Sequence, residues 1–194
     1  VLLALCCAAV SILFCVVLHC TEHLYKKWIP DEWLRITAGG CLVILMTKLL
    51  GTTDYLGAGM DVIELAMEGQ VIAAAFLVKM VFTAVSLGSG FRGGEIVPTL
   101  FVGATFGCLF GQVTGLSPSL AAACGMASVF CGVTNCPVSS LLLSFELFGF
   151  ECMPFFLLSV SIAYLESGYY GLYHSQKILY SKTKLKFINT YTKE

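Results

Sequence analysis

The sequence predicts an all-α, polytopic integral membrane protein made of short, tilted and broken helices, and three observations support this prediction. Hydrophobic residues make up 58% of the 194 residues and charged residues only 12%, whereas a soluble domain needs a far more polar surface. No Asp, Glu, Lys, Arg or His occurs from Ile96 to Phe145. Glycine and proline interrupt the apolar segments, which is tolerated at membrane depth where helices line a cavity.

The first part of the chain predicts two membrane helices and a surface helix. Residues 1–20 form an apolar run about as long as a membrane is thick, and residues 34–50 form a second apolar helix. Residues 52–59 have the composition of a turn. A short, mildly amphipathic helix with acidic residues is expected at about 60–69.

The N-terminal segment does not have the pattern of a secretory signal, because it lacks a basic start and a small-residue cleavage site. The chain also begins at Val1 rather than Met. We therefore expect the chain to be the end of a longer protein, in which residues upstream contribute part of any binding site.

The remaining helices are separated by glycine or proline, and several have only about 11 to 16 residues, too few to cross a bilayer straight. They are expected at about 71–87, 98–110, 117–134, 137–148 and 154–165. Half-helices whose N-termini meet near the bilayer midplane are how transporters hold anionic groups. The lysine-rich stretch at the end of the chain favours a cytoplasmic C-terminus.

The glycine-rich turn Ser89–Pro98 carries the strongest functional signal. Glycines at positions 88, 90, 93 and 94 permit unusual backbone torsions and leave N–H groups bare, and proline suits the first turn of a helix. Several N–H groups and the positive end of the helix dipole then point at one spot. Because the surroundings are apolar, we expect an intramembrane site for a small anion.

The motifs of this region resemble the CLC chloride channel and transporter family. Ser89–Gly107 (SGFRGGEIVPTLFVGATFG) resembles a family signature, a Gly-Gly-x-Phe-x-Pro turn followed by a small-residue helix. Residues 132–147 resemble the next helix, and residues 168–178 resemble the start of the final helix, where the family has a tyrosine. The resemblance implies that residues 1–187 form the C-terminal half of a CLC-type transmembrane domain, followed by a short polar cytoplasmic tail at 188–194.

The resemblance also implies an anion site, formed by backbone N–H groups just before the signature proline and by a tyrosine hydroxyl. The anion-binding positions are Gly94, Glu95, Ile96, Val97 and Tyr173, with Gly93 and Pro98 forming the turn and the helix start. Neutral donors hold an ion weakly enough for it to leave again. For Tyr173 the alternative is an interfacial tyrosine beside two neighbouring tyrosines.

Glu95 departs from most CLC sequences, which have an aliphatic residue there and then Phe. A glutamate after the Gly-Gly pair resembles the fluoride-exporting branch of the family, although Val97 stands where that branch usually has threonine. A protonated Glu95 could donate to fluoride and an ionised one would repel it, so Glu95 is the candidate for coupling anions to protons. The alternative is a salt bridge from Glu95 to Arg92.

These features predict transmembrane transport of chloride or fluoride, with proton-coupled antiport as the expected mechanism and Glu95 favouring fluoride export. A voltage-gated-type chloride channel is the alternative. An intramembrane serine protease built on Ser89 is a remote one, because no histidine occurs between residues 24 and 173. A non-transporting membrane scaffold would not explain the glycine-rich turn. We expect neither an enzyme nor a cofactor.

The expected partners are a small inorganic anion, protons, the lipid bilayer and a second copy of the chain. Family members are homodimers, and the helices at about 136–148 and 153–166 match those at their interface, where Ser139, Ser140 and Ser144 would allow close packing. With a net charge of −1, the chain lacks a basic footprint for nucleic acid. The expected location is a plasma membrane of bacterial type, crossed several times.

Other polar residues are expected to be structural. Lys79 lies within an apolar helix, where an ion pair or snorkelling to the membrane surface is the default. His19, His23 and His174 lie near segment ends, and no metal site is expected from them. The ten cysteines lie mostly in apolar runs, as small buried hydrophobic residues do.

Overall fold

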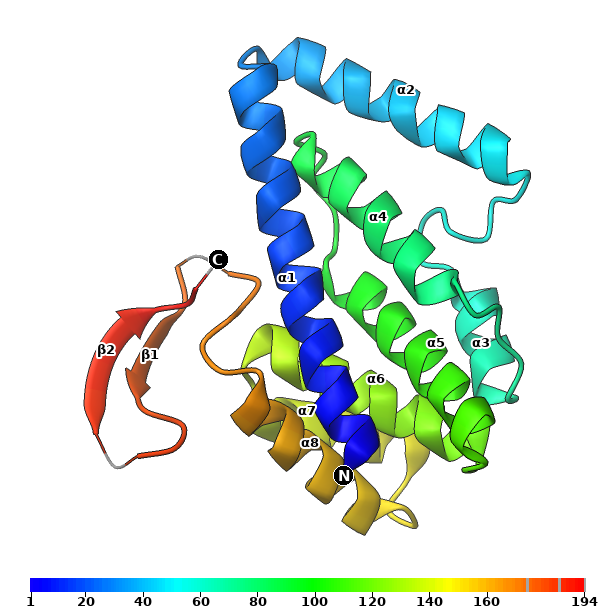
Figure 1. Ribbon diagram of the computed structural model, residues 1–194, viewed down its shortest axis with the longest axis vertical. Helices are drawn as coiled ribbons and strands as arrows, with labels where there is room; N and C mark the ends of the chain where they lie inside the picture. The colour runs from blue at the N-terminus through cyan, green and yellow to red at the C-terminus, as the bar shows by residue number, and fades with distance from the viewer. Residues whose placement is uncertain (174, 185, 194) are drawn as a thin grey trace.

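The computed structural model describes residues 1–173, 175–184 and 186–193, which form eight helices and one β-hairpin (Figure 1). The helices are α1 (Leu2–Trp28), α2 (Glu32–Leu50), α3 (Met60–Met67), α4 (Ala75–Gly88), α5 (Ile96–Thr114), α6 (Pro118–Thr134), α7 (Pro137–Phe148) and α8 (Met153–Glu166), and the strands are β1 (Lys177–Tyr180) and β2 (Phe187–Tyr191). The predicted helical membrane architecture is confirmed. His174, one of the three histidines considered above, lies outside the described residues.

Among the described residues, three helices are long and apolar enough to cross a membrane, namely α1, α2 and α5. α5 was expected to be short, from 98 to 110, but helical backbone begins at Ile96 and continues to Thr114. The helices α4, α6, α7 and α8 have 14, 17, 12 and 14 residues and are the short apolar helices that the sequence predicts.

α1 continues past its predicted end at residue 20 as far as Trp28. The polar residues of this extension suit a helix: Lys26 donates to Glu22 over 2.6 Å, four residues apart on one face. Lys26 and Lys27 also lie in the last turn, where cations interact favourably with the helix dipole. The extension brings additional polar side chains of α1 close to the glycine-rich turn.

Glycines let the backbones of α5 and α6 meet at the centre of the bundle. A Cβ at Gly103 would lie 2.6 Å from the carbonyl oxygen of Gly125, and a Cβ at Gly107 would overlap the backbone of Ala121. α6 is buried along nearly all its length. Close backbone approach at small residues is how membrane helices gain packing energy, and here it fixes α5, whose N-terminus carries the expected site.

The chain after α8 does not form the helix that the family resemblance implies. Residues 169–173, 175 and 176 form no helix, and β1 and β2 then pair in an antiparallel hairpin in which Lys177 lies opposite Tyr191. Both strands contain β-branched and aromatic residues, which favour extended backbone. β2 includes part of the stretch expected to be a polar tail.

Two of the three serines that were expected to allow close packing at a dimer interface point inward. Ser140 and Ser144 are buried, and their hydroxyls donate to the carbonyl oxygens of Cys136 and Ser140 over 2.7 and 2.6 Å. Ser139 alone of the three is exposed. The outward face of α7 therefore carries large apolar side chains such as Val138 and Leu142, together with Ser139 and Glu146.

The cysteines are free thiols, and five of the ten are buried. Cys20 and Cys41 are exposed, so the expectation of burial holds for only part of the set. Both exposed cysteines lie on apolar helices, α1 and α2.

Candidate functional site

The glycine-rich turn connects α4 to α5 and is held in place by α2. The Arg35 side chain donates to the carbonyl oxygen of Ser89 over 3.3 Å, and a Cβ at Gly39 would overlap the Ser89 side chain. Of the four turn glycines, only Gly90 has a positive φ, at +103°. Gly94 does not have a positive φ, and the space where its Cβ would be is open. The absence of a side chain there leaves the backbone accessible.

The N-terminus of α5 presents backbone N–H groups that the helix itself does not use. Thr99 N–H donates to the Glu95 carbonyl over 3.3 Å, which is the hydrogen bond that starts the helix. The N–H groups of Ile96 and Val97 precede it and have no intrahelical acceptor, and Pro98 has no N–H. The helix dipole adds partial positive charge at this end, so the start of α5 offers hydrogen-bond donors that suit an anion.

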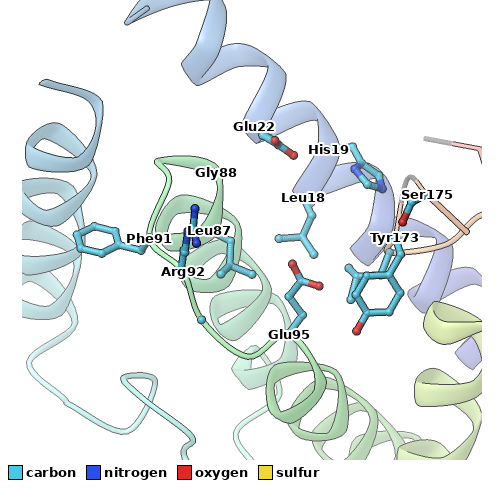
Figure 2. Close-up of a pocket in the computed structure, with 12 residues that line it drawn as sticks. Leu18, His19, Glu22, Leu87, Gly88, Phe91, Arg92, Glu95, Tyr173 and Ser175 are labelled. Atoms are coloured by element: carbon cyan, nitrogen blue, oxygen red, sulfur yellow. The ribbon is translucent and has the colours of Figure 1, made fainter. Parts of the chain in front are cut away.

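A cavity of about 520 Å³ lies between this helix start and α1. We call it the Tyr173 cavity; its lining includes Glu95, Tyr173, His19, Glu22 and Arg92. In Figure 2 the Glu95 carboxyl points into the cavity and the Tyr173 ring lies beside it. The structure therefore brings together two predicted site residues, Glu95 and Tyr173, that are far apart in the sequence.

The phenol of Tyr173 lies in the irregular segment after α8, outside the membrane-spanning helices, and is 42% exposed. Burial, and then the nearby Glu95 carboxylate, raise the pKa of Tyr173. The hydroxyl therefore keeps its proton and can donate to an anion. The interfacial alternative for this tyrosine does not explain why it lies in a cavity with Glu95.

Hydrogen bonds to three other elements hold the segment around Tyr173. Leu172 N–H donates to the Val133 carbonyl over 3.0 Å, at the end of α6. The ring nitrogen Nε2 of His19 lies 3.1 Å from the Gly171 carbonyl oxygen. Thr192 of the hairpin donates to the Tyr173 carbonyl over 2.8 Å. The phenol is thus positioned by α6, α1 and the hairpin together.

Lys182, in the loop between the strands, connects the hairpin to the bundle. Its ammonium donates to Asn135 Oδ1 over 2.5 Å and to the Tyr164 carbonyl over 2.8 Å. The Asn135 amide in turn donates to the Tyr170 carbonyl over 2.7 Å, three residues before Tyr173. Burial lowers the pKa of Lys182 to about 8.

A second cavity of about 360 Å³ lies behind the turn, between α4, the loop before α3 and the start of α5. We call it the Lys79 cavity; Gly94, Val97 and Pro98 line it, and Gly93 and Leu87 line both cavities. The Ile96 side chain is 43% exposed and lies outside both described linings. The predicted site residues are therefore divided between the two sides of the turn.

Lys79 is not the ion pair or the snorkelling side chain that the sequence analysis expects. It is 2% exposed, and its ammonium donates to the carbonyl oxygens of Tyr55 and Gly57 over 3.0 and 2.7 Å. The same ammonium lies 5.0 Å from the centre of the Phe101 ring. A salt bridge between described side chains joins Lys26 to Glu22; Lys79 has no described carboxylate in its cavity.

Sequence reasoning missed the contribution of α1 to the Tyr173 cavity. His19 and Glu22 are three residues apart and share one helix face, a spacing that marks a polar patch at the end of an apolar helix. The remote protease interpretation gains nothing, since Ser89 is buried and its hydroxyl donates to the Ser86 carbonyl over 2.8 Å. In the described part of the chain, no group of three His, Cys, Asp or Glu residues could hold a metal.

Comparison with known proteins identifies relatives of this chain. A family model described as voltage gated chloride channel matches residues 1–168. A chloride/fluoride channel protein from Pseudomonas syringae pv. tomato is 34% identical over 178 residues, covering 89% of this chain and 39% of that protein. A voltage-gated ClC-type chloride channel, ClcB, from Escherichia coli is 29% identical over 156 residues, covering 74% of this chain and 37% of the relative.

The crystal structure of a CLC-type fluoride/proton antiporter matches with a TM-score of 0.85 at 31% identity, covering 89% of this chain and 44% of that one. The chain thus spans about two fifths of the length of these relatives. Because the family model matches most of the chain and the fold agrees, the chain belongs to the voltage-gated chloride channel (CLC) family of membrane proteins.

Proposed function

We propose that the protein moves a small inorganic anion, chloride or fluoride, across a membrane, and that the anion binds in the Tyr173 cavity. The observation that carries the proposal is the position of Glu95 and Tyr173 in one cavity at the exposed N-terminus of α5. The amides of Ile96 and Val97 and the Tyr173 hydroxyl are the donors, with Gly93 and Gly94 leaving the backbone accessible. All of these donors are neutral, so the anion binds without being trapped.

Glu95 gives the site its second function, the coupling of anion movement to protons. It is the N-cap residue of α5, and its carboxyl points into the cavity in which the anion would bind (Figure 2). An ionised Glu95 competes with the anion for these donors, and a protonated Glu95 can itself donate a hydrogen bond. Alternation between the two forms exchanges an anion for a proton, and the named activity of the fluoride/proton antiporter supports this mechanism.

The test is an efflux assay on the purified protein reconstituted in liposomes, with fluoride or chloride and a pH probe in the same vesicles. We expect fluoride efflux to exceed chloride efflux, with protons moving in the opposite direction. Glu95→Gln should abolish proton movement, because the amide cannot exchange a proton. Glu146→Gln is the matched control, since Glu146 is exposed on α7 outside both cavities. Unchanged proton movement in Glu95→Gln would remove Glu95 from the coupling mechanism.

A voltage-gated-type chloride channel is the second candidate, supported by the similarity to ClcB. The same efflux assay distinguishes a proton-coupled antiporter from a chloride channel. A channel would pass chloride at least as fast as fluoride and would leave the pH of the vesicle interior unchanged. Absence of flux for both anions would favour a membrane scaffold.

The arrangement of the protein in the membrane completes the proposal. The exposed apolar face of α7 and α8 is the proposed homodimer interface, and each subunit has its own anion site. The lysine-rich C-terminal segment lies on the cytoplasmic side, in a plasma membrane of bacterial type.

A further inference from the structure

The Lys79 cavity shares a wall with the Tyr173 cavity but has different chemistry. Leu87 and Gly93 line both, so a single turn of backbone separates the two spaces. The lining of the Lys79 cavity includes one ionisable cation, Lys79, and no carboxylate among the described residues. By contrast, two carboxylates line the Tyr173 cavity, those of Glu22 and Glu95.

The charge of Lys79 is balanced only in part by its neighbours. The two carbonyl oxygens satisfy two of the three ammonium N–H groups. The Phe101 ring contributes a further attraction through its π face. None of these groups carries a net negative charge, and a buried cation without an anionic partner is unfavourable. A small anion in the adjoining cavity would supply the missing charge and accept the third N–H.

Other groups of the cavity also suit an anion. Ser86 and Gly94 lie in the same lining, close to the positive end of the α5 dipole. Thr83 is also present, but its hydroxyl proton is used, because it donates to the Lys79 carbonyl over 2.8 Å. The remaining lining is mostly apolar and would exclude large hydrated ions.

We propose that the Lys79 cavity is a second binding site for a small monovalent inorganic anion, held by the Lys79 ammonium and the Ser86 hydroxyl behind the turn that carries the transport site. The site is distinct from the Tyr173 cavity and does not depend on Glu95 or Tyr173. An anion bound there would also stabilise the loop that contains Tyr55 and Gly57, through Lys79.

The experiment uses bromide as the probe, on the native protein in detergent. Anomalous diffraction from crystals grown with bromide locates bound ions, and calorimetric titration measures their affinity. We expect a bromide peak within hydrogen-bond distance of Lys79 Nζ. Lys79→Met, which keeps the length of the side chain without its charge, should remove this peak and weaken the second binding step at least about tenfold. Lys48→Met is the control, since Lys48 is an exposed lysine of the apolar helix α2.

The outcomes separate this proposal from the proposed transport site. Bromide at Lys79 would support the second site whether or not bromide also binds at Tyr173, because a transport site that prefers fluoride excludes the larger bromide. Bromide at Tyr173 alone, or a peak at residue 79 that persists in Lys79→Met, would overturn the second site and leave Lys79 with the structural task of holding the loop. If Lys79→Met does not fold, the anomalous map of the wild-type protein shows whether bromide binds at Lys79. Ser86→Ala should then weaken bromide binding in the Lys79 cavity and leave binding in the Tyr173 cavity unchanged.

Discussion

Tyr173 can serve as a neutral donor because its surroundings keep the phenol protonated. Burial and the Glu95 carboxylate both raise the pKa of Tyr173. The same carboxylate would repel an anion when ionised, so the two side chains have opposite effects in one cavity. The hydroxyl contributes one hydrogen bond, and its share of the binding free energy is that of a single donor to a charged acceptor.

Tyr173→Phe should therefore weaken fluoride or chloride binding at least about tenfold, since a hydrogen bond to a charged group contributes about 1.5–3 kcal/mol. Isothermal titration of the purified protein measures the effect. Tyr180→Phe is the control, because Tyr180 is an exposed tyrosine of β1. Equal affinity in the two variants would show that Tyr173 does not bind the anion.

Gly90 is the turn glycine at which the backbone itself requires glycine. Its φ is +103°, and a Cβ there would still be 3.5 Å from the nearest atom, Cγ1 of Ile36. Backbone strain at this φ, rather than a steric clash, therefore opposes a side chain at position 90. Gly90→Ala should destabilise the protein by about 1–3 kcal/mol and lower its melting temperature in detergent. Gly94→Ala should leave the melting temperature unchanged, and equal melting of both variants would refute this assignment of strain.

At the scale of elements, the hairpin is one of three parts of the fold that hold the segment around Tyr173. Lys182 donates to α6 through Asn135 and to the end of α8 through the Tyr164 carbonyl. Both helices end at these points, and a cation near a helix C-terminus is favourable. Burial nevertheless outweighs these interactions and lowers the pKa of Lys182 from 10.5 to about 8.

This shift predicts a pH dependence of stability. Between pH 8 and 10.5 the unfolded chain holds a proton at Lys182 that the folded chain releases, so stability from this group rises with pH in that window. Below pH 8 both states are protonated and the burial penalty is fully present. In Lys182→Met, the part of the rise in melting temperature that comes from this group should be absent. The measurement is the difference in melting temperature between variant and wild type at each pH. Lys184→Met should retain it, because Lys184 is exposed.

The sequence predicts the helices well and the hairpin not at all, for a physical reason. Apolar runs longer than ten residues between glycine and proline breaks have few alternatives to a helix in a membrane. Residues 177–191 carry lysines, β-branched and aromatic residues in nearly equal number, which suits a strand as well as an amphipathic helix end. Tertiary contacts such as those of Lys182 decide between them, and these contacts are not visible in the local pattern.

At the scale of the whole molecule, the site combines segments from distant parts of the chain. The motif at Ser89–Pro98 predicts the helix N-terminus, and the family resemblance predicts Tyr173. The polar face of α1 and the division of the turn residues between two cavities depend on how α1, α4 and α5 pack. Packing of this kind arises from long-range contacts, such as the glycine crossing of α5 and α6, which a single sequence does not specify.

The surface of the bundle exposes large apolar side chains on several helices, and they need either lipid or protein as neighbours. On α7, Val138 and Leu142 are 69% and 63% exposed, and on α8, Phe155 is 54% exposed. α2 is also mostly exposed, with Leu45 at 53%. Lipid tails are as apolar as these side chains, so hydrophobicity alone does not distinguish an interface from a lipid-facing surface.

The shape of the surface distinguishes a protein interface from a lipid-facing surface, because membrane helices associate by close packing. If α7 and α8 form the homodimer interface, Leu142→Trp adds bulk within that packing and should shift the protein towards monomer. Leu45→Trp adds the same bulk to α2 and should leave the dimer intact. Single-molecule subunit counting at increasing lipid dilution in liposomes measures the dimer fraction of both variants. A monomer at all dilutions in wild type, or an equal shift in both variants, would exclude this face as the dimer interface.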